Sequence, residues 1–577
     1  MKLIFTLIAI LSVQYSLEAQ SKLIYNSPIN NSVMHNPETE VILRFNNEIN
    51  KQTLMKSCFN LSGSISGNHS YEYVNTTFQN TIILKPNQAF YLNEIVSLSL
   101  NKPFLFKDNS SFDTYSLSFQ IRSNQQKKTV LSNEDEWYFS NPKSSSTLPD
   151  HVIEINNNPI DLPIFFKNNG NANDKFFGII NNDGSVLELF ESNALGINFS
   201  LQPNGYLTLF DNPNDQFLIY DSSFNKIDSL ICGNGYLTDF HELIIDNNNY
   251  SYLMSYDTQV MDMSQIVSGG NPAANVTGTI IQKLDENKNV VFQWRTWDHF
   301  QITDATIDIT KPNFDYSHGN SIDVDSSGNL LVSFRNMDEI TKIDGLTGSI
   351  IWRLSGTNNE FTVLNDSTMT SKQHDARFLS SNRITVFDNG SDHSTPLASA
   401  KEYTINETTK TATLVWRYNH PLDVHSARTG NVQRLSNGNT FINWGYRNDN
   451  AYPNWTEVTP NGNIVYQFRF SGGSNYSTYR AKKHSWTVPT PTQIPTKEEN
   501  INPIIYPNPG NGIIAIRVPK EKNNIKAEVL DIRGQTIIVK SITNSENQFN
   551  IKSLPNGFYL IRLTINGTQS VSKYIKN

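Results

Sequence analysis

The chain has 577 residues, with 46 lysines and arginines against 54 aspartates and glutamates and a formal net charge of −8. This length is enough for several domains. The acidic balance, without clusters of basic residues, argues against nucleic acid or an anionic membrane as a partner. Many asparagines, serines, threonines and aromatic residues, together with Asn-Gly and Asp-Gly turns, are typical of a large secreted all-β protein.

Residues 1–19 have the pattern of a signal peptide. Lys2 supplies the positive charge, residues 3–11 form an apolar core, and Ser16-Leu17-Glu18-Ala19 offers a cleavage site. The apolar run is too short to span a bilayer, so a membrane anchor is the weaker alternative. No later stretch is apolar enough for a transmembrane helix, and we predict export without a membrane span.

The two cysteines, Cys58 and Cys232, are distant in the sequence. Export would permit a disulfide between them, but two distant cysteines make neither a disulfide scaffold nor a cysteine-based metal site. We expect both to be small, buried residues.

Residues 22–122 are predicted to form the first domain, a β-sandwich. Residues 41–45, 81–86, 96–100 and 119–122 alternate or cluster as short strands between turns. The segments 45–50 (FNNEIN) and 82–91 (IILKPNQAFY) resemble the Ig-like domains of bacterial surface proteins. That resemblance implies a fold and no activity. Residues 123–133 are a polar linker.

Residues 134–488 repeat a strand–turn–strand unit. The hairpin turns are Asp183-Gly184, Asn204-Gly205, Asn247-Asn248-Asn249, Ser327-Gly328, Ser381-Asn382 and Asn437-Gly438. Repeated units of four short strands are the signature of a β-propeller. Six hairpins predict six blades, with five or seven as alternatives.

Residues 489–502 form a Pro/Thr linker, and 503–577 form a small C-terminal β-domain. Its opening Tyr506-Pro507-Asn508-Pro509, the segment 554–560 (LPNGFYL) and the basic tail 573–576 (KYIK) resemble the C-terminal sorting domain of the type IX secretion system of Bacteroidetes. The resemblance implies recognition by that machinery, export across the outer membrane, and release or surface attachment. The alternative is a plain Ig-like module.

Three histidines precede hairpin turns at similar distances. His374 and His241 lie eight residues before Asn382 and Asn249, and His318 lies ten before Gly328. The first strand of each propeller blade lines the central channel, so these histidines are predicted to meet at one end of it.

Other polar residues accompany the histidines. Asn320 follows His318 by two, so it projects from the same face of a strand. Arg335 ends the strand 330–335. Thr429 lies nine residues before Gly438, whereas His425 lies thirteen before it and is expected just outside the channel.

Several chemical uses fit this set. Three histidines suit a zinc or copper site, although an arginine beside them would repel a cation. Arg335 and the histidines could instead clamp sulfate or phosphate, and one histidine could be a nucleophile toward the clamped group. The alternative is a structural role, in which each histidine forms hydrogen bonds to backbone groups of its own hairpin turn.

The propeller region resembles the arylsulfotransferase family. The motifs that carry the resemblance are Gln373-His374, Phe387-Asp388-Asn389-Gly390 and His318-Gly319-Asn320. The resemblance implies an aryl sulfate donor, a phenolic acceptor and no cofactor, with His374 as the nucleophile that becomes sulfated. It further implies that the sulfuryl oxygens are bound by His241, His318, Arg335, Asn320 and Thr429, and we add His425 as a candidate at the edge. The lack of a Gly-rich phosphate loop agrees with a reaction that needs no nucleotide donor.

Two alternatives remain at this stage. One is a non-catalytic surface propeller that binds a sulfated or carbohydrate ligand. The other is a metal-dependent propeller hydrolase or lyase.

Overall fold

The computed structural model describes residues 22–124, 143–144, 147–168, 176–191, 198–447, 449–471, 476–486, 504–506, 508, 510–517, 525–531, 535–542, 546–565 and 568–577. The predicted signal peptide and the linker at 489–502 lie outside them, as does most of the linker at 123–133. The chain forms two compact units, residues 1–488 and residues 489–577.

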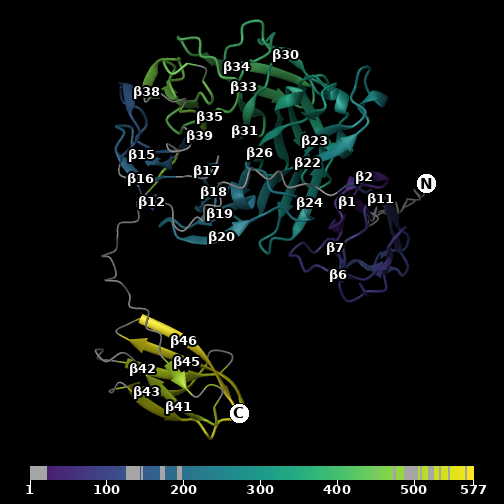
Figure 1. The fold of residues 1–577 in the computed structure, drawn as a ribbon, viewed down its shortest axis with the longest axis vertical. Helices are drawn as coiled ribbons and strands as arrows, with labels where there is room; N and C mark the ends of the chain where they lie inside the picture. Colours follow the sequence, from purple (N-terminus) through teal and green to yellow (C-terminus); the bar gives the residue numbers. More distant parts are fainter. Residues whose placement is uncertain are drawn as a thin grey trace, which may run out of the picture. The chain divides into compact units, whose positions relative to one another are not determined.

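The protein is all-β (Figure 1). In the described part, helix is confined to α1 (Thr296–His299) and four 3-10 turns, η1 (Asn212–Asn214), η2 (Met263–Gln265), η3 (Ile302–Asp304) and η4 (Arg335–Met337). Within the same ranges, none of the helices has the length and apolar character that a bilayer span requires.

The N-terminal domain is built from two larger sheets and a small hairpin. One sheet has the order β1-β3-β7-β6, the other β2-β11-β8-β4-β5, and β9 pairs with β10. Apolar side chains from both sheets, such as Leu43, Phe45 and Leu98, form one buried core between them. The strands are β1 (Leu23–Ser27), β2 (Ser32–His35), β3 (Val41–Phe45), β4 (Phe59–Gly63), β5 (Gly67–His69), β6 (Tyr71–Tyr73), β7 (Thr81–Pro86), β8 (Ile95–Leu100), β9 (Phe104–Leu105), β10 (Ser111–Phe112) and β11 (Ser116–Ile121).

In the described part of residues 143–483, the strands form six mainly antiparallel sheets, in which most paired strands are neighbours in the sequence. The first three comprise β12 (Lys143–Ser144), β14 (Ile164–Asn168), β15 (Phe176–Ile180) and β16 (Val186–Glu191); then β17 (Phe199–Leu201), β18 (Leu207–Asp211), β19 (Gln216–Tyr220) and β20 (Lys226–Leu230); then β21 (Leu243–Ile245), β22 (Ser251–Met261), β23 (Ala274–Leu284) and β24 (Val290–Arg295), with β25 (Asn313–Asp315) pairing with β23.

The other three sheets follow the same order. They comprise β26 (Gly319–Val324), β27 (Leu330–Phe334), β28 (Glu339–Ile343) and β29 (Ile350–Ser355); then β31 (His374–Ser380), β32 (Arg383–Asp388), β33 (Ser399–Asn406) and β34 (Thr411–Asn419), with β30 (Thr362–Leu364) on β34; then β35 (Asn431–Arg434), β36 (Thr440–Asn443), β37 (Trp455–Val458) and β38 (Ile464–Phe470).

Two strand pairings join the end of this region to its start. β39 (Thr478–Lys483) pairs with β14, with Ile164 opposite Lys483. β13 (His151–Asn156) pairs with β38, with His151 opposite Phe470. Figure 1 shows the sheets arranged around a centre at which β17, β26, β31, β35 and β39 gather. The first strands of several sheets therefore lie at this centre, together with β39, the last strand of the region.

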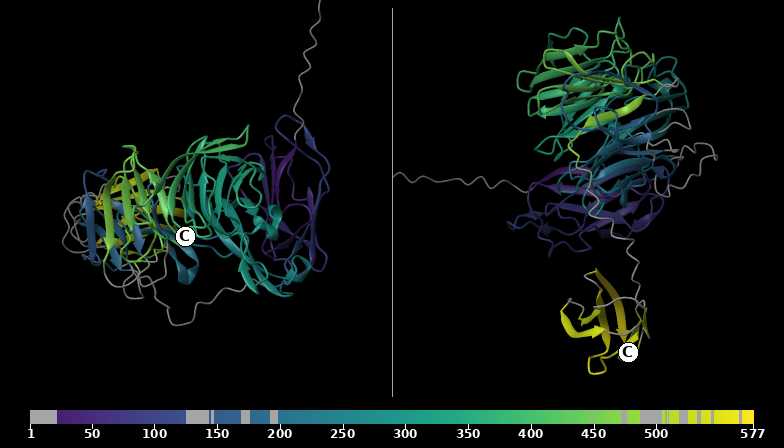
Figure 2. Two further views of the ribbon diagram at one scale, coloured as in Figure 1. Left: turned by 90° about the horizontal axis from the view of Figure 1, so that it is seen from above. Right: turned by 90° about the vertical axis from the view of Figure 1, so that its left-hand side faces the viewer.

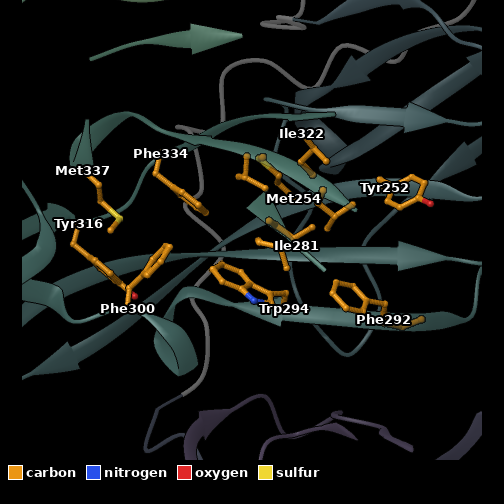
Figure 3. Close-up of a cluster of buried hydrophobic side chains, with 14 of the residues drawn as sticks. Tyr252, Met254, Ile281, Phe292, Trp294, Phe300, Tyr316, Ile322, Phe334 and Met337 are labelled. Carbon is orange, nitrogen blue, oxygen red and sulfur yellow. The ribbon is translucent and has the colours of Figure 1, made fainter. Parts of the chain in front are cut away.

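The largest buried cluster lies between the third and fourth of these sheets (Figure 3). Trp294 is 1% exposed, and its ring lies 6.1 Å from that of Phe334, which is fully buried. Tyr25 and Ile42 of the N-terminal domain belong to the same cluster. The N-terminal domain therefore packs some of its apolar side chains against the sheet β21–β24, and Figure 2 shows the two side by side.

Cys58 and Cys232 are both buried, as expected, and no disulfide joins them. The C-terminal unit has sheets of order β40-β41-β44 and β43-β42-β45-β46 around a core that includes Ile514, Ile561 and Tyr574. Its strands are β40 (Ile504–Tyr506), β41 (Ile513–Arg517), β42 (Ile525–Leu530), β43 (Thr536–Ile542), β44 (Glu546–Asn550), β45 (Gly557–Ile565) and β46 (Thr568–Lys576).

Candidate active site

The three histidines lie at the starts of consecutive inner strands. His374 is the first residue of β31, His318 directly precedes β26, and His241 precedes β21 by two residues. His318 has a left-handed backbone with φ 50°, which turns the chain into the strand. The following Gly319 is required because a Cβ there would lie 2.7 Å from a side-chain carbon of Thr279.

His374 is held in one tautomer. Its Nδ1 lies 3.1 Å from the backbone oxygen of Lys372 and 2.7 Å from Oδ1 of Asn389. A backbone carbonyl can only accept, so Nδ1 carries the proton and donates. The backbone N–H of Thr429 donates to Nε2 of His374 over 3.1 Å. The lone pair of His374 is therefore on Nε2.

The imidazole of His374 is neutral at physiological pH. Burial lowers its pKa well below the usual value, and the positive charge of Arg335 lowers it further. His318 and His241 act on His374 in the same direction. His241, His318 and Arg335 therefore lie close enough to His374 for their charges to lower its pKa.

His241 and His318 form two aspartate–histidine pairs side by side. Nδ1 of His241 lies 2.6 Å from Oδ1 of Asp239, and Nδ1 of His318 lies 3.0 Å from Oδ2 of Asp315. The two imidazole centroids are 5.1 Å apart. Burial lowers the pKa of His241, although Asp239 opposes this. The His318 side chain keeps 26% of its surface exposed, so it is the more accessible of the two.

Tyr256 of β22 packs against both of these histidines. Its ring centroid lies 5.3 Å from that of His241 and 5.5 Å from that of His318. Its hydroxyl donates to the backbone oxygen of Gly319 over 2.8 Å. Tyr256 therefore sets the orientation of the two rings.

Arg335 and Thr429 place polar atoms next to His374. Arg335 donates to the backbone oxygen of Ala427 over 3.2 Å, which ties it to the segment that carries Thr429. Thr429 has a left-handed backbone with φ 61°, a strained conformation for a β-branched residue. Among the described residues, Nε of Arg335 and Oγ1 of Thr429 are buried without a hydrogen-bond partner. Buried polar atoms left unsatisfied beside a lone pair are suited to an oxygen-rich ligand.

Asn320 and His425 are placed differently from the other predicted residues. Asn320 is fully buried, and its Nδ2 donates to the backbone oxygen of Gln373 over 2.8 Å, which joins β26 to β31. Its Oδ1 is buried and unpaired among the described residues. His425 is half-buried and precedes Ser426, whose backbone oxygen accepts from Asn389.

A layer of buried charges lies behind the histidines. Glu242 follows His241, and its carboxylate pairs with Arg377 at 2.6 Å and Arg480 at 2.7 Å. Asp375 follows His374 and pairs with the same two arginines, at 2.6 and 3.2 Å. The network joins β31 and β39 to Glu242, which directly precedes β21, and it therefore sets the spacing of the inner strands that carry the site.

Sequence reasoning missed four residues of the site, Asp239, Asp315, Tyr256 and Asn389 as a histidine partner. The segments Asp239-Phe240-His241 and Asp315-Tyr316-Ser317-His318 place a carboxylate close before each histidine. That local spacing could have indicated the pairs. No sequence pattern indicated Tyr256, because it reaches the site from the second strand of its sheet.

In the described ranges, no group of three or more histidine, cysteine, aspartate or glutamate side chains has an arrangement that could hold a metal ion. Each site histidine instead directs Nδ1 at a neighbouring oxygen.

Residues 184–471 match the family model described as arylsulfotransferase (ASST), and residues 504–577 match the secretion system C-terminal sorting domain. The chain therefore carries a domain of the arylsulfotransferase family followed by a type IX sorting domain.

No curated protein sequence matches the chain. Among solved structures, a protein of unknown function from Bacteroides caccae is 13% identical, with a TM-score of 0.35, and the match covers 54% of this chain and 97% of that one. A virginiamycin B lyase variant from Staphylococcus aureus, solved with quinupristin, is 10% identical over 64% of this chain and 96% of that one, with a TM-score of 0.30. PorZ, a surface component of the type IX secretion system of Porphyromonas gingivalis, is 7% identical over 96% of this chain and 100% of that one, with a TM-score of 0.23.

The sorting domain directs the protein across the outer membrane, to the cell surface or the medium. It also supports an interaction with the type IX secretion machinery.

Proposed function

We propose that the protein is a secreted aryl-sulfate sulfotransferase whose six central sheets are the blades of a β-propeller, assigned to residues 134–488. The sequential strand order and the return of β39 to pair with β14 support this architecture. We assign the two flanking domains, 22–122 and 503–577, as Ig-like β-sandwiches. In each domain, two sheets of mainly antiparallel strands around one core support that assignment.

One observation carries the proposed reaction, the neutral His374 with its lone pair on Nε2. In the first step, Nε2 attacks the sulfur of an aryl sulfate ester, a nitrogen–sulfur bond forms, and the sulfur–aryl oxygen bond breaks. The sulfuryl group then resides on Nε2. The proton stays on Nδ1, which continues to donate a hydrogen bond to Oδ1 of Asn389. The ring gains the positive charge that balances the sulfonate.

Arg335 and Thr429 stabilise the sulfuryl oxygens during transfer. In the resting site the backbone N–H of Thr429 donates to Nε2 of His374. Once Nε2 has formed its bond to sulfur, this N–H donates to a sulfuryl oxygen instead. Oγ1 of Thr429 and Nε of Arg335 are the buried polar atoms that such oxygens would satisfy. We assign Asn320 a supporting role through the β26–β31 contact, and His425 a place at the rim.

His318 handles the proton of the phenol, supported by Asp315. The leaving phenolate is the conjugate base of an acid with a pKa of about 10, so a proton donor lowers the barrier modestly. Protonated His318 gives its proton to the leaving oxygen. In the second step it takes the proton of the acceptor phenol, whose oxygen attacks sulfur as the nitrogen–sulfur bond breaks. His241 and its partner Asp239 line the site beside His318.

The test is incubation of the purified protein with p-nitrophenyl sulfate and a phenolic acceptor. We expect release of p-nitrophenol, a sulfated acceptor, and a sulfuryl adduct on the peptide containing His374 by mass spectrometry at low acceptor concentration. The variant H374A should lose both adduct and transfer. H420A is the matched control, because His420 is equally buried but bonds to Gln467 in another sheet.

Two outcomes would contradict the proposal. An unchanged rate in H374A would show that His374 is not the nucleophile. No transfer by a folded wild-type protein would favour the alternative, a surface propeller that binds a sulfated or carbohydrate ligand without turnover.

A further inference from the structure

The third sheet has two strands that reach well beyond the others. β22 and β23 pair along their whole length, from Ser251 opposite Leu284 to Met261 opposite Ala274. β21 pairs only with residues 251–253, and β24 only with residues 280–284. We call the part beyond these two pairings, residues 256–261 and 274–279, the β22–β23 extension.

One side of the extension contacts the histidine site. Tyr256 packs on the rings of His241 and His318. β25 pairs with the extension, Asp315 opposite Thr277, and so the extension also places the carboxylate that holds His318. The orientation of His318 therefore depends on the extension through both of its neighbours.

The other side of the extension contacts the N-terminal domain. Arg122 directly follows β11, and its Nη1 lies 2.9 Å from Oδ1 of Asp257, with both side chains fully buried. Its Nη2 donates to the backbone oxygen of Thr258 over 2.7 Å. Asp257 is adjacent to Tyr256, so one residue step along β22 separates the interdomain ion pair from the site.

This ion pair is anchored on both sides. The backbone N–H of Arg122 donates to the backbone oxygen of His35 over 2.9 Å. Trp297 and Gln259 donate to Oδ2 of Asp257 over 3.1 and 2.7 Å. Burial raises the pKa of Asp257, and the positive charges of Arg122 and Arg295 oppose this. Arg122 of the N-terminal domain and Asp257 of β22 thus form a buried ion pair between the two domains.

We propose that the N-terminal domain is a working part of the site, in which Arg122, through Asp257 and Thr258, holds the β22–β23 extension so that Tyr256 and Asp315 orient His241 and His318. Arg122 and Asp257 are positioning residues in this arrangement and touch no substrate. The kinetic consequence rests on the proposed sulfuryl transfer, whereas the structural consequence does not.

The test compares two buried arginines of the N-terminal domain that both bond to the neighbouring sheets. R122M removes the partner of Asp257. R44M is the matched control, because Arg44 is buried and donates to the backbone oxygens of Val291 and Leu346, in β24 and in the loop after β28. Hydrogen exchange of the full-length variants is followed by mass spectrometry in peptides spanning 254–261 and 313–318.

We expect R122M to exchange faster in both peptides, and R44M to keep the wild-type pattern there. With p-nitrophenyl sulfate, kcat should fall roughly 100-fold in R122M with KM little changed, as for misplaced catalytic groups. Wild-type exchange in R122M would overturn the inference, as would equal effects of R122M and R44M. If the wild-type protein transfers no sulfate, the exchange result still decides this inference while the proposed function fails.

R122K covers the case in which R122M does not fold. A lysine keeps the charge but has no planar fork to hold the Asp257 carboxylate and the Thr258 carbonyl together. Faster exchange confined to the two peptides supports the inference, and a wild-type pattern with wild-type kcat contradicts it.

Discussion

The backbone N–H of Thr429 donates to Nε2 of His374, with the two nitrogens 3.1 Å apart. Thr429 precedes the first strand of the last sheet and His374 begins the first strand of the sheet before it, so the bond crosses between two sheets. It occupies the lone pair that would attack sulfur. A donor ester must therefore displace this bond, and the released N–H then faces the incoming oxygens.

The first prediction concerns pH. Because burial and Arg335 hold the pKa of His374 well below 6.5, the imidazole is neutral across the physiological range, and His374 should impose no acid limb there. N389D puts a carboxylate on Nδ1, which favours the imidazolium and raises the pKa of His374. The rate of p-nitrophenol release in N389D should then fall relative to the wild-type rate as the pH decreases. A profile identical to the wild type would contradict the assigned tautomer.

The second prediction concerns Gly445. Its φ is 62°, and a Cβ there would lie 2.6 Å from Oγ1 and from the carbonyl carbon of Thr429. G445A should displace Thr429 from His374 and slow transfer roughly 100-fold, the scale expected for a displacement of about 1 Å. G328A is the control, because Gly328 also has a left-handed φ, 84°, but its Cβ would meet nothing within 4 Å. Equal loss in both variants would show a general backbone effect.

The third prediction concerns the charges behind the histidines. E242Q removes the carboxylate that bridges Arg377 and Arg480, and leaving these buried arginines short of a partner should cost about 3–5 kcal/mol of unfolding free energy. E154Q is the comparison, because Glu154 pairs with Arg469 at a site where both side chains are about a quarter exposed. Its effect should stay within about 1 kcal/mol. Urea unfolding measures both, and a small effect of E242Q would show that the network does not hold the inner strands.

The fourth prediction concerns the core in Figure 3. Trp294 is 1% exposed and stacks on His299 with ring centroids 4.5 Å apart. W294A should lower the unfolding free energy of the larger unit by about 3–5 kcal/mol. L364A removes a side chain that is 44% exposed, and its effect should stay within about 0.5 kcal/mol. Similar midpoints for the two variants in urea would contradict this placement of the core.

Much of the fold could be predicted from local pattern. The segments 41–45 and 81–86 are strands with those bounds, because alternating or β-branched apolar runs between turn residues favour one local structure. The repeated hairpins indicated the sheets of the central region for the same reason. The return of β39 to β14 had no local signal, since it joins residues about 300 apart.

The sequence by itself determined that the protein is all-β and exported, and it singled out His241, His318, His374 and Arg335 as one candidate set. These conclusions depend on periodicity, turn chemistry and motifs, which are local. Only the tertiary structure decided which nitrogen of His374 has the lone pair, and that Asp239, Asp315 and Tyr256 orient the other two histidines. Those properties depend on contacts between sheets, such as Thr429 on His374, and on burial, which lowers the pKa of the imidazole. The contact of Arg122 with Asp257 likewise exists only because one domain packs on another.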